Sequence, residues 1–226
     1  MRPGEGRLDV FCDSLESPMP DVLRSIENEA VRDGVPVIRR GTRRALRMLL
    51  ALRKPKTVLE IGTAVGFSAV YMYLEGGAPV TTIENRPERI REARRNIVRA
   101  GAEGGVRLLE GDARTILPQL DGPYDLIFLD AAKGQYITLL PELLRLLSGD
   151  GVLAADNILE GGETLDSRFA VERRNRTIHA RIRAYLEAVY ANPELTTTIL
   201  PVGDGLAVSC RAEGRGSLRG EEDETS

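Results

Sequence analysis

The sequence predicts one α/β domain with a mostly parallel central sheet, and three observations lead to that prediction. Short apolar runs alternate with helical patterns through most of the chain, as they do in βαβ units. The length of 226 residues suits one such domain. Near the C-terminus, two strand-like runs flank a tight Gly-Asp turn, which predicts an antiparallel hairpin. We therefore expect a seven-stranded sheet that ends in this hairpin, with helices on both faces.

The expected elements follow this alternation in order. Two helices come first, at residues 18–33 and 41–53. Five strands, each a short and mainly apolar run, are expected at 57–61, 80–84, 106–110, 124–130 and 151–156. Helical patterns follow the first four strands, at 66–75, 86–100, 112–120 and 134–147. A long amphipathic helix at about 169–191 then leads to the hairpin strands at 195–202 and 205–211.

No internal repeat or linker divides the body of the chain. We therefore expect residues 1–212 to form one domain that includes an N-terminal helical segment. Residues 213–226, EGRGSLRGEEDETS, are rich in Gly, Ser and acids, and their charges account for the whole net charge of −3. This composition is typical of a disordered tail.

The composition is that of a globular protein, with 42% hydrophobic and 29% charged residues. No apolar run approaches the roughly 18 residues that a membrane span needs, and the N-terminus lacks the apolar core of a signal peptide. Cys12 and Cys210 lie far apart without the spacing of a metal site. We therefore expect a cytoplasmic protein with reduced thiols and no membrane partner.

Each parallel strand ends on or beside an acid. In strand order these acids are Glu60, Glu84, Glu110 with Asp112, Asp130 and Asp156. A single acid at a strand end is commonly a helix cap or part of a turn. Five strand ends with acids, at the edge where parallel sheets bind ligands, indicate a site for a hydroxyl-rich or cationic ligand and a metal ion.

The fourth and fifth strands supply the candidate metal ligands Asp130, Asp156 and Asn157. These strands should be neighbours, so two carboxylates and an amide oxygen converge. Such hard oxygen ligands suit Mg²⁺ or a similar divalent cation. Asp156 and Asn157 alone are also a common turn pair, and that alternative is weakened by their alignment with Asp130.

Lys133 follows Asp130 by three residues and is one of three lysines in a chain with 28 arginines. An incidental surface lysine after a helix cap is the simplest interpretation of this spacing. Lysine, however, can release its proton when its pKa is depressed, whereas arginine cannot. Beside a predicted metal site, Lys133 is therefore a candidate general base.

The first strand is followed by the turn GTAVG, which predicts a close approach of the backbone to a ligand at Gly62. The turn lacks the G-x-G-x-x-G spacing of a dinucleotide-binding motif. Glu84, at the end of the next strand, is placed to accept hydrogen bonds from ribose hydroxyls. By itself the turn is a weak signal, because tight glycine turns are common structural devices.

Taken in order, EIGTAVGFSA, IEN, EGDA, IFLDAAKGQY and AADN resemble the class I methyltransferases that use S-adenosylmethionine and have a Rossmann-like fold. More narrowly, they resemble the metal-dependent O-methyltransferases that include catechol and caffeoyl-CoA enzymes. The resemblance covers roughly residues 36–211. The stretch RRNRTI and the ending NPELTTTILPVGDGLAVSCR are similar to bacterial enzymes that convert 5-hydroxyuridine to 5-methoxyuridine at the tRNA wobble position.

The resemblance implies S-adenosylmethionine and Mg²⁺ as cofactors, and a homodimer. It implies that Lys133 and Asp130 are catalytic, and that Asp130, Asp156 and Asn157 hold the metal. The residues that it implies for cofactor binding are Ile38, Glu60, Gly62, Thr63, Ser68, Glu84, Asn85, Asp112, Ala113 and Asp130.

Two arginine-rich stretches favour an RNA substrate over a small one, because RNA phosphates attract cations. An unpaired wobble base in an anticodon loop can be turned into the site at modest cost. The candidate RNA-binding residues are Arg39, Arg40, Arg43, Arg173, Arg174 and Arg176. Charge runs are also typical of solvated helix faces, so each assignment is a hypothesis. His179 is interpreted as structural or RNA-facing.

Three alternatives stay open at this point. The same reaction on a small catechol-like or caffeoyl-CoA-like phenol fits the motifs equally well, although the absence of tryptophan argues against a tight aromatic slot. An NAD-dependent oxidoreductase is disfavoured by the missing dinucleotide motif and the acidic strand ends. A catalytically inactive cofactor-binding module would be expected to lack one of Asp130, Lys133, Asp156 or Asn157, and all four are present.

Overall fold

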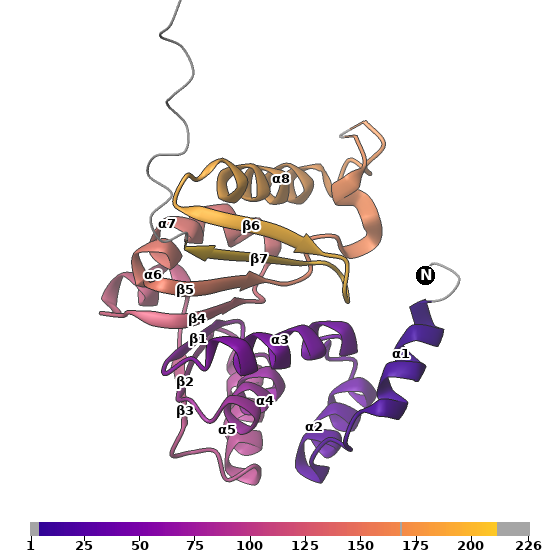
Figure 1. The fold of residues 1–226 in the computed structure, drawn as a ribbon, viewed down its shortest axis with the longest axis vertical. Helices are drawn as coiled ribbons and strands as arrows, with labels where there is room; N and C mark the ends of the chain where they lie inside the picture. The colour runs from indigo at the N-terminus through magenta and orange to yellow at the C-terminus, as the bar shows by residue number, and fades with distance from the viewer. Residues whose placement is uncertain (1–4, 168, 212–226) are drawn as a thin grey trace, which may run out of the picture.

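The computed structural model describes residues 5–167 and 169–211, which fold around one seven-stranded sheet (Figure 1). The strand order is β3-β2-β1-β4-β5-β7-β6. The strands are β1 Val58–Ile61, β2 Val80–Glu84, β3 Val106–Glu110, β4 Tyr124–Leu129, β5 Leu147–Ala155, β6 Leu195–Leu200 and β7 Leu206–Arg211. Strands β1 to β5 pair in parallel, and β7 runs antiparallel to both β5 and β6. The predicted Rossmann-like α/β fold with a C-terminal hairpin is confirmed.

The register of the central strands places their carboxyl ends in one row. Ile61 of β1 pairs with Leu129 of β4, and Leu129 pairs with Ala155 of β5. The residue after each of these three is therefore delivered to the same edge of the sheet. The strand order also reverses between β1 and β4, and such a switch point is where doubly wound sheets open a crevice for ligands.

Helices cover both faces of the sheet. On one face lie α2 Asp21–Arg32, α3 Arg40–Arg53, α4 Phe67–Gly76 and α5 Pro87–Arg99. The other face is covered by α6 Ala113–Ile116, α7 Tyr136–Leu146 and α8 Arg176–Ala191. The remaining elements are α1 Glu5–Leu15 and the 3-10 turns η1 Leu117–Gln119, η2 Lys133–Gln135 and η3 Glu160–Leu165.

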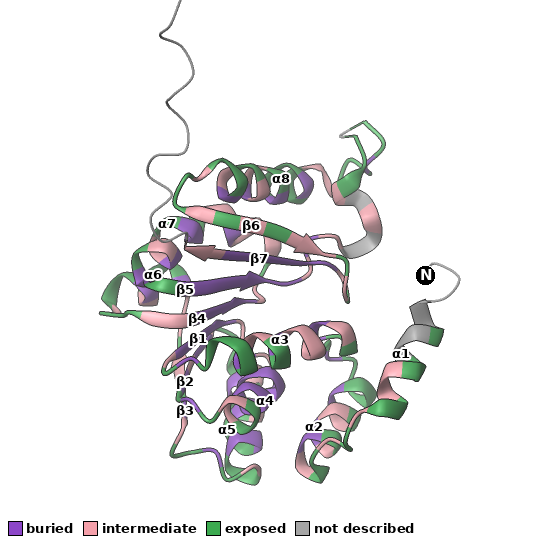
Figure 2. Ribbon diagram, in the orientation of Figure 1, coloured by how far each residue is buried: buried purple, intermediate pink, exposed green. Residues whose placement is uncertain are grey.

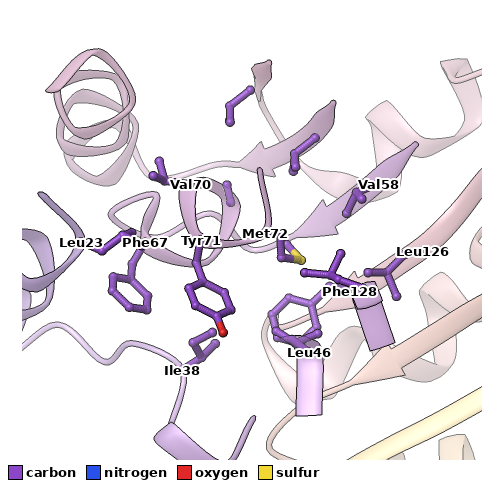
Figure 3. Packing of buried hydrophobic residues seen from close by; sticks show 14 of the residues in the cluster. Leu23, Ile38, Leu46, Val58, Phe67, Val70, Tyr71, Met72, Leu126 and Phe128 are labelled. Carbon is purple, nitrogen blue, oxygen red and sulfur yellow. The ribbon is translucent and has the colours of Figure 1, made fainter. Parts of the chain in front are cut away.

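Alternate residues of each central strand enter two separate cores, because successive side chains of a strand point to opposite faces. Val58 and Phe128 belong to the core under α3 and α4, where Figure 3 shows Met72 facing Phe128. Leu59 and Ile127 belong to the core under α7 and α8. Figure 2 shows the resulting buried centre of the sheet, in β4, β5 and β7, beside a more exposed edge strand β6.

Two predicted helices are shorter than expected. The predicted helix 112–120 is wrong in its second half, because Pro118 cannot continue the ladder and the chain turns into η1 after Ile116. The predicted helix 134–147 begins as the 3-10 turn η2, and α7 starts at Tyr136. Strand β5 starts at Leu147, four residues before the predicted 151, across a register shift against β4.

The prediction of a helix from residue 169 is wrong, because α8 starts only at Arg176. Val171 is buried and accepts a hydrogen bond of 3.1 Å from Arg176 Nε, so the chain turns there before the helix begins. Helix α1 was not predicted. The predicted tail 213–226 lies outside the described residues. None of the described helices is long and apolar enough to span a membrane.

Candidate active site

A cavity of about 1630 Å³ opens at the carboxyl ends of the parallel strands. Its wall is formed by the turns after β1, β2, β3 and β4, the start of α3 and the turn between β6 and β7. Most of the predicted cofactor-binding residues line it: Ile38, Gly62, Thr63, Ser68, Glu84, Asn85, Ala113 and Asp130. Glu60 and Asp112 are not part of the wall.

Gly62 brings the turn after β1 against the end of β4. Its φ is +104°, and a Cβ at this position would lie 2.0 Å from the carbonyl oxygen of Asp130. Only glycine fits here, because it has no Cβ and adopts positive φ without strain. The predicted close approach of the backbone is therefore present, and it joins the predicted cofactor turn to the predicted metal ligand.

Glu84 holds the same turn in shape. Its Oε2 accepts a hydrogen bond of 2.8 Å from the Ala64 amide, and its Oε1 accepts from the amides of Asn85 and Arg86 at 2.9 and 3.0 Å. The carboxylate therefore links the turns after β1 and β2. Since Glu84 also lines the cavity, it can accept hydrogen bonds from a ligand's hydroxyls there.

Glu60 lies beneath the cavity and is fully buried. Burial raises the pKa of its carboxyl to about 7, against the hydroxyls of Ser68 and Thr82, which lower it. Thr82 Oγ1 donates a hydrogen bond of 2.5 Å to Oε2, while Oε1 has no hydrogen-bond partner among the described residues. This orphaned oxygen gives the site capacity for one further donor.

Asp112 caps the N-terminus of α6. Its Oδ1 accepts a hydrogen bond of 2.9 Å from the Arg114 amide, and Arg114 Nη2 lies 2.6 Å from Oδ2. Hydrogen bonds from Arg114 lower the pKa of this carboxyl. The side chain of the next residue, Ala113, is the one that lines the cavity.

The three predicted metal ligands lie together. Asn157 Nδ2 donates a hydrogen bond of 2.7 Å to Asp130 Oδ1, and Asp156 Oδ1 accepts from the Asn157 amide at 2.8 Å. Asn157 has a φ of +60°, a left-handed conformation that asparagine tolerates. Tyr136, fully buried, donates its hydroxyl to the backbone oxygen of Asp156 at 3.1 Å. Thr42 Oγ1 donates to Asp156 Oδ1 at 3.2 Å.

The electrostatics of this group suit a cation. Burial, and then the charge of Asp156, raise the pKa of Asp130 to about 7, against the Asn157 hydrogen bond and the charge of Lys133. Burial likewise raises the pKa of Asp156 to about 6. Asp156 is buried and Asp130 is half-buried, and two poorly hydrated carboxylates that repel each other are stabilised by a divalent cation. Among the described residues no group of three His, Cys, Asp or Glu side chains could hold a metal, so the candidate third protein donor beside the two acids is the side-chain amide of Asn157.

Lys133 lies at the first position of η2 and lines the cavity. Its charge lowers the pKa of both Asp130 and Asp156, so it acts on the two acids together. Arg181 of α8 donates a hydrogen bond of 3.2 Å to the carbonyl of Gly134 and so fastens α8 to this turn. The structure thus brings the candidate base and the candidate ligands to one place.

Known proteins provide the decisive comparison. The profile of the O-methyltransferase family matches residues 16–212. A catechol O-methyltransferase from Niastella koreensis is 31% identical over 215 residues, which cover 89% of this chain and 95% of that protein.

The chain belongs to the O-methyltransferase family.

Solved structures agree with this assignment. A putative caffeoyl-CoA O-methyltransferase from Staphylococcus aureus superposes with a TM-score of 0.83 at 29% identity, covering 92% of this chain and 99% of that one. An S-adenosylhomocysteine-bound methyltransferase from Podospora anserina superposes with a TM-score of 0.82 at 27% identity, covering 94% and 97%.

The sequence analysis did not identify two residues of this candidate site. Thr42 contacts Asp156, and Asp204, in the turn between β6 and β7, lines the cavity. The charge of Asp204 contributes to the raised pKa of both Asp130 and Asp156. The sequence contained a signal for Asp204, an acid between two glycines after a strand, but we interpreted GD only as a hairpin turn.

The N-terminal arginines of the methyltransferase are largely paired with acids. Arg43 forms an ion pair of 3.0 Å with Glu27, its side chain is only 13% exposed, and it lies over the Phe67 ring. Arg40 pairs with Asp13 of α1. Arg39 and Arg40 line the cavity, whereas Arg43 does not. The basic stretch is therefore partly neutralised within the fold.

The C-terminal arginines lie outside the cavity wall. Arg173 and Arg174 are exposed in the turns before α8, and Arg174 forms an ion pair of 2.8 Å with Glu172. Arg176 binds the Val171 carbonyl. His179 is buried and contacts the Asp166 carbonyl through Nε2 at 3.1 Å, which confirms the structural interpretation of this histidine.

Proposed function

We propose that this O-methyltransferase transfers a methyl group from S-adenosylmethionine to the hydroxyl of 5-hydroxyuridine at the wobble position of tRNA, and that the reaction depends on Mg²⁺. The observation that carries the proposal is the group of Asp130, Asp156 and Asn157 beside Lys133, in which Asp130, Asn157 and Lys133 line one cavity and Asp156 is buried directly behind them.

The turns after β1 and β2 suit the cofactor. Gly62 exposes backbone at the cavity wall, and Glu84 presents a carboxylate that can accept hydrogen bonds from ribose hydroxyls. The orphaned Oε1 of Glu60 offers a buried acceptor below the same turn, although the side chain does not reach the wall. The S-adenosylhomocysteine bound by the Podospora anserina relative supports this assignment.

Asp130, Asp156 and Asn157 would hold the metal. Their oxygen donors are those that Mg²⁺ prefers, and the pKa of both acids is raised by burial and then by neighbouring negative charge, which a cation would offset. When bound, such a cation lowers the pKa of a hydroxyl that it contacts. Thr42 and Tyr136 fix the side chain and the backbone of Asp156 in place.

Lys133 would accept the proton of the substrate hydroxyl. A neutral lysine has a lone pair for this role, and arginine stays protonated at any working pH. The hydrogen bond from Arg181 to Gly134 keeps the η2 turn against α8, so the lysine is presented from a fixed backbone. In this scheme Gly62 and Asp130 keep the cofactor turn next to the reacting oxygen.

An RNA substrate is supported by the charge of the site. The cavity of about 1630 Å³ has room for a cofactor and a substrate base together, against roughly 300–1,000 Å³ for one ordinary small-molecule pocket. Arg39 and Arg40 lie in its wall, where their positive charge favours the approach of a polyanion. A wobble base is unpaired in the anticodon loop and can be splayed into such a site.

The second candidate is the same reaction on a catechol-like phenol. It is favoured by the Niastella koreensis relative, which is named a catechol O-methyltransferase. Catechol presents two vicinal oxygens, and 5-hydroxyuracil presents its hydroxyl beside a ring carbonyl, so the same three ligands suit either substrate. The chain has no tryptophan to build an aromatic slot around a small phenol.

We also propose that the protein acts as a cytoplasmic homodimer. Apolar side chains are exposed on two N-terminal helices, Phe11 and Leu15 on α1 and Met48 and Leu52 on α3. Exposed apolar surface of this kind is typical of an interface. Analytical ultracentrifugation tests this proposal, and a monomer at micromolar concentration would contradict it.

Methyl transfer from labelled S-adenosylmethionine tests the proposed substrate. The acceptors are tRNA that carries 5-hydroxyuridine, the same tRNA with unmodified uridine, and catechol, each at equal concentration. We expect label in the hydroxylated tRNA alone or in strong excess. Label in catechol only would assign the second candidate, and label in none of the three would reject both.

A further inference from the structure

Arg39 and Asp204 form an ion pair in the wall of the cavity that the candidate metal ligands Asp130 and Asn157 also line. Arg39 Nε lies 2.9 Å from Asp204 Oδ2, and both residues line the cavity together with Asp130 and Lys133. Asp204 lines the same cavity as Asp130 and Asn157. The two side chains come from the N-terminal end of α3 and from the β6–β7 turn, which Figure 1 shows next to each other.

The backbone around Asp204 is fixed. Its carbonyl accepts a hydrogen bond of 2.8 Å from the Leu159 amide, and the Gly205 carbonyl accepts one of 3.1 Å from the Ile158 amide. A Cβ at Gly203 would lie 2.5 Å from Thr42 Oγ1, so the turn packs directly on the first turn of α3. The carboxylate of Asp204 is thus held in a defined place relative to the ligand Asp156, which Thr42 contacts.

The pair keeps polar groups free to bind a ligand. Arg39 engages only Oδ2, and no described residue donates a hydrogen bond to Asp204 Oδ1. The Asp204 side chain is 25% exposed and that of Arg39 is 67% exposed. Exposed ion pairs contribute little to stability, so a stabilising role does not account for the placement of the pair. The pair presents to the cavity one hydrogen-bond acceptor, Asp204 Oδ1, next to the guanidinium donors of Arg39.

We infer that Asp204 and Arg39 recognise the imide edge of the substrate base, with Asp204 accepting the ring N–H and Arg39 donating to the carbonyl beside it. This inference rests on the proposed function. In 5-hydroxyuracil the 5-hydroxyl and the O4 carbonyl beside it would face the metal ligands. The N3–H is next to O4 on the ring, and the O2 carbonyl is next to N3, so these two groups form the edge that Asp204 and Arg39 would contact. Catechol has neither group, so the pair would select a uracil ring over a phenol.

The test compares two acceptors that differ only in this edge. They are anticodon stem-loop RNAs with 5-hydroxyuridine or with N3-methyl-5-hydroxyuridine, and the measured quantity is the ratio of their kcat/KM values. For the wild type we expect a preference of roughly 10- to 100-fold for the N3–H base, since a matched base-edge contact gives discrimination of that size. A wild-type ratio near one would overturn the inference without any variant.

Two substitutions separate recognition from electrostatics. Asp204→Ala removes the acceptor, and we expect its ratio to fall to about one, whatever happens to the absolute rates. Asp204→Asn keeps an amide oxygen without the charge, so part of the preference should return. If both variants lower the two rates equally and keep the wild-type ratio, Asp204 acts only through its charge, and the inference is overturned.

A control variant and a third acceptor complete the design. Glu142→Gln removes an acid from an exposed ion pair with Arg145, away from the cavity, and should keep the wild-type ratio. Catechol is assayed in parallel. If the wild type methylates catechol and neither RNA, the proposed tRNA substrate and this inference both fail. If it methylates the RNA with the ratio unaltered in Asp204→Ala, only this inference fails.

Discussion

Gly62 and Asp130 approach so closely that a Cβ at position 62 would lie 2.0 Å from the Asp130 carbonyl oxygen. The Asp130 amide in turn donates a hydrogen bond of 2.9 Å to the Ile61 carbonyl. The turn after β1 and the end of β4 therefore cannot move apart without breaking this hydrogen bond, and they cannot come closer without a steric clash. The proposed cofactor turn and the proposed metal ligand share one rigid junction.

Gly62→Ala is expected to disturb this junction severely. The new methyl group would meet backbone, and the φ of +104° is a conformation that L-residues rarely adopt. We expect the free energy of unfolding to fall by at least about 2 kcal/mol, measured by urea denaturation. Gly104→Ala is the matched control, because a Cβ there meets nothing within 4 Å. Equal stability of the two variants would contradict the junction.

Because the pKa of the buried Glu60 is raised, we expect the free energy of unfolding to depend on pH in a particular way. Its pKa is about 7 in the folded protein against 4.5 for the free group, so between these values the folded state binds more protons than the unfolded state. Its contribution is therefore present at low pH and is lost as pH rises through about 7. Glu60→Gln should remove that loss, which is on the order of 3 kcal/mol.

Urea denaturation of the metal-free protein at about pH 5 and about pH 8 measures this effect. The wild type should lose more stability than Glu60→Gln on going to the higher pH, and Glu142→Gln on the surface should behave as the wild type does. Parallel losses in wild type and Glu60→Gln would show that the buried carboxyl does not titrate as expected.

Lys133→Arg separates charge from basicity. The variant keeps a positive charge near Asp130 and Asp156, so its thermal stability should match that of the wild type. Turnover should fall by about 10²- to 10⁴-fold, the usual contribution of a general base, because arginine cannot accept the proton. Lys56→Arg, which changes a lysine outside the cavity wall, should keep full turnover. Wild-type rates in Lys133→Arg would exclude the lysine as base.

Substitution of Arg173 and Arg174 tests whether tRNA binds to the surface outside the cavity, because both residues are exposed and neither lines the cavity. Reversing both charges to Glu should weaken tRNA binding and flatten its dependence on salt concentration, while affinity for S-adenosylmethionine is unchanged. Reversal of Arg95 and Arg107, which are exposed on α5 and β3, is the control. An unaltered salt dependence in the first variant would remove these arginines from the RNA surface.

The sequence predicted the strands and the edge of the sheet at which the candidate site lies, because both depend on local patterns. Apolar runs located the strands, and the acid at each strand end pointed to the edge where ligands bind. Asp130 and Asn157 are joined by a hydrogen bond across 27 residues of chain, because β4 and β5 pair in parallel and end side by side. Here the local pattern and the sheet geometry lead to the same arrangement.

What the sequence did not predict depends on contacts between distant segments. Thr42 lies 114 residues before Asp156, and Arg39 lies 165 residues before Asp204, so no periodicity connects them. Arg43 looked like a surface charge until the structure placed it between Glu27 and the Phe67 ring. In the same way, the buried Val171 turns the chain where the local pattern continued as a helix.

The central claim is that methyl transfer depends on a metal held by Asp130, Asp156 and Asn157. The most direct test measures transfer by the wild type and by Asp130→Asn, first after chelation and then with excess Mg²⁺, with binding of S-adenosylmethionine followed in parallel. We expect wild-type transfer to vanish on chelation and to return with Mg²⁺, and Asp130→Asn to stay inactive in both conditions. Undiminished transfer by the chelated wild type would contradict the account.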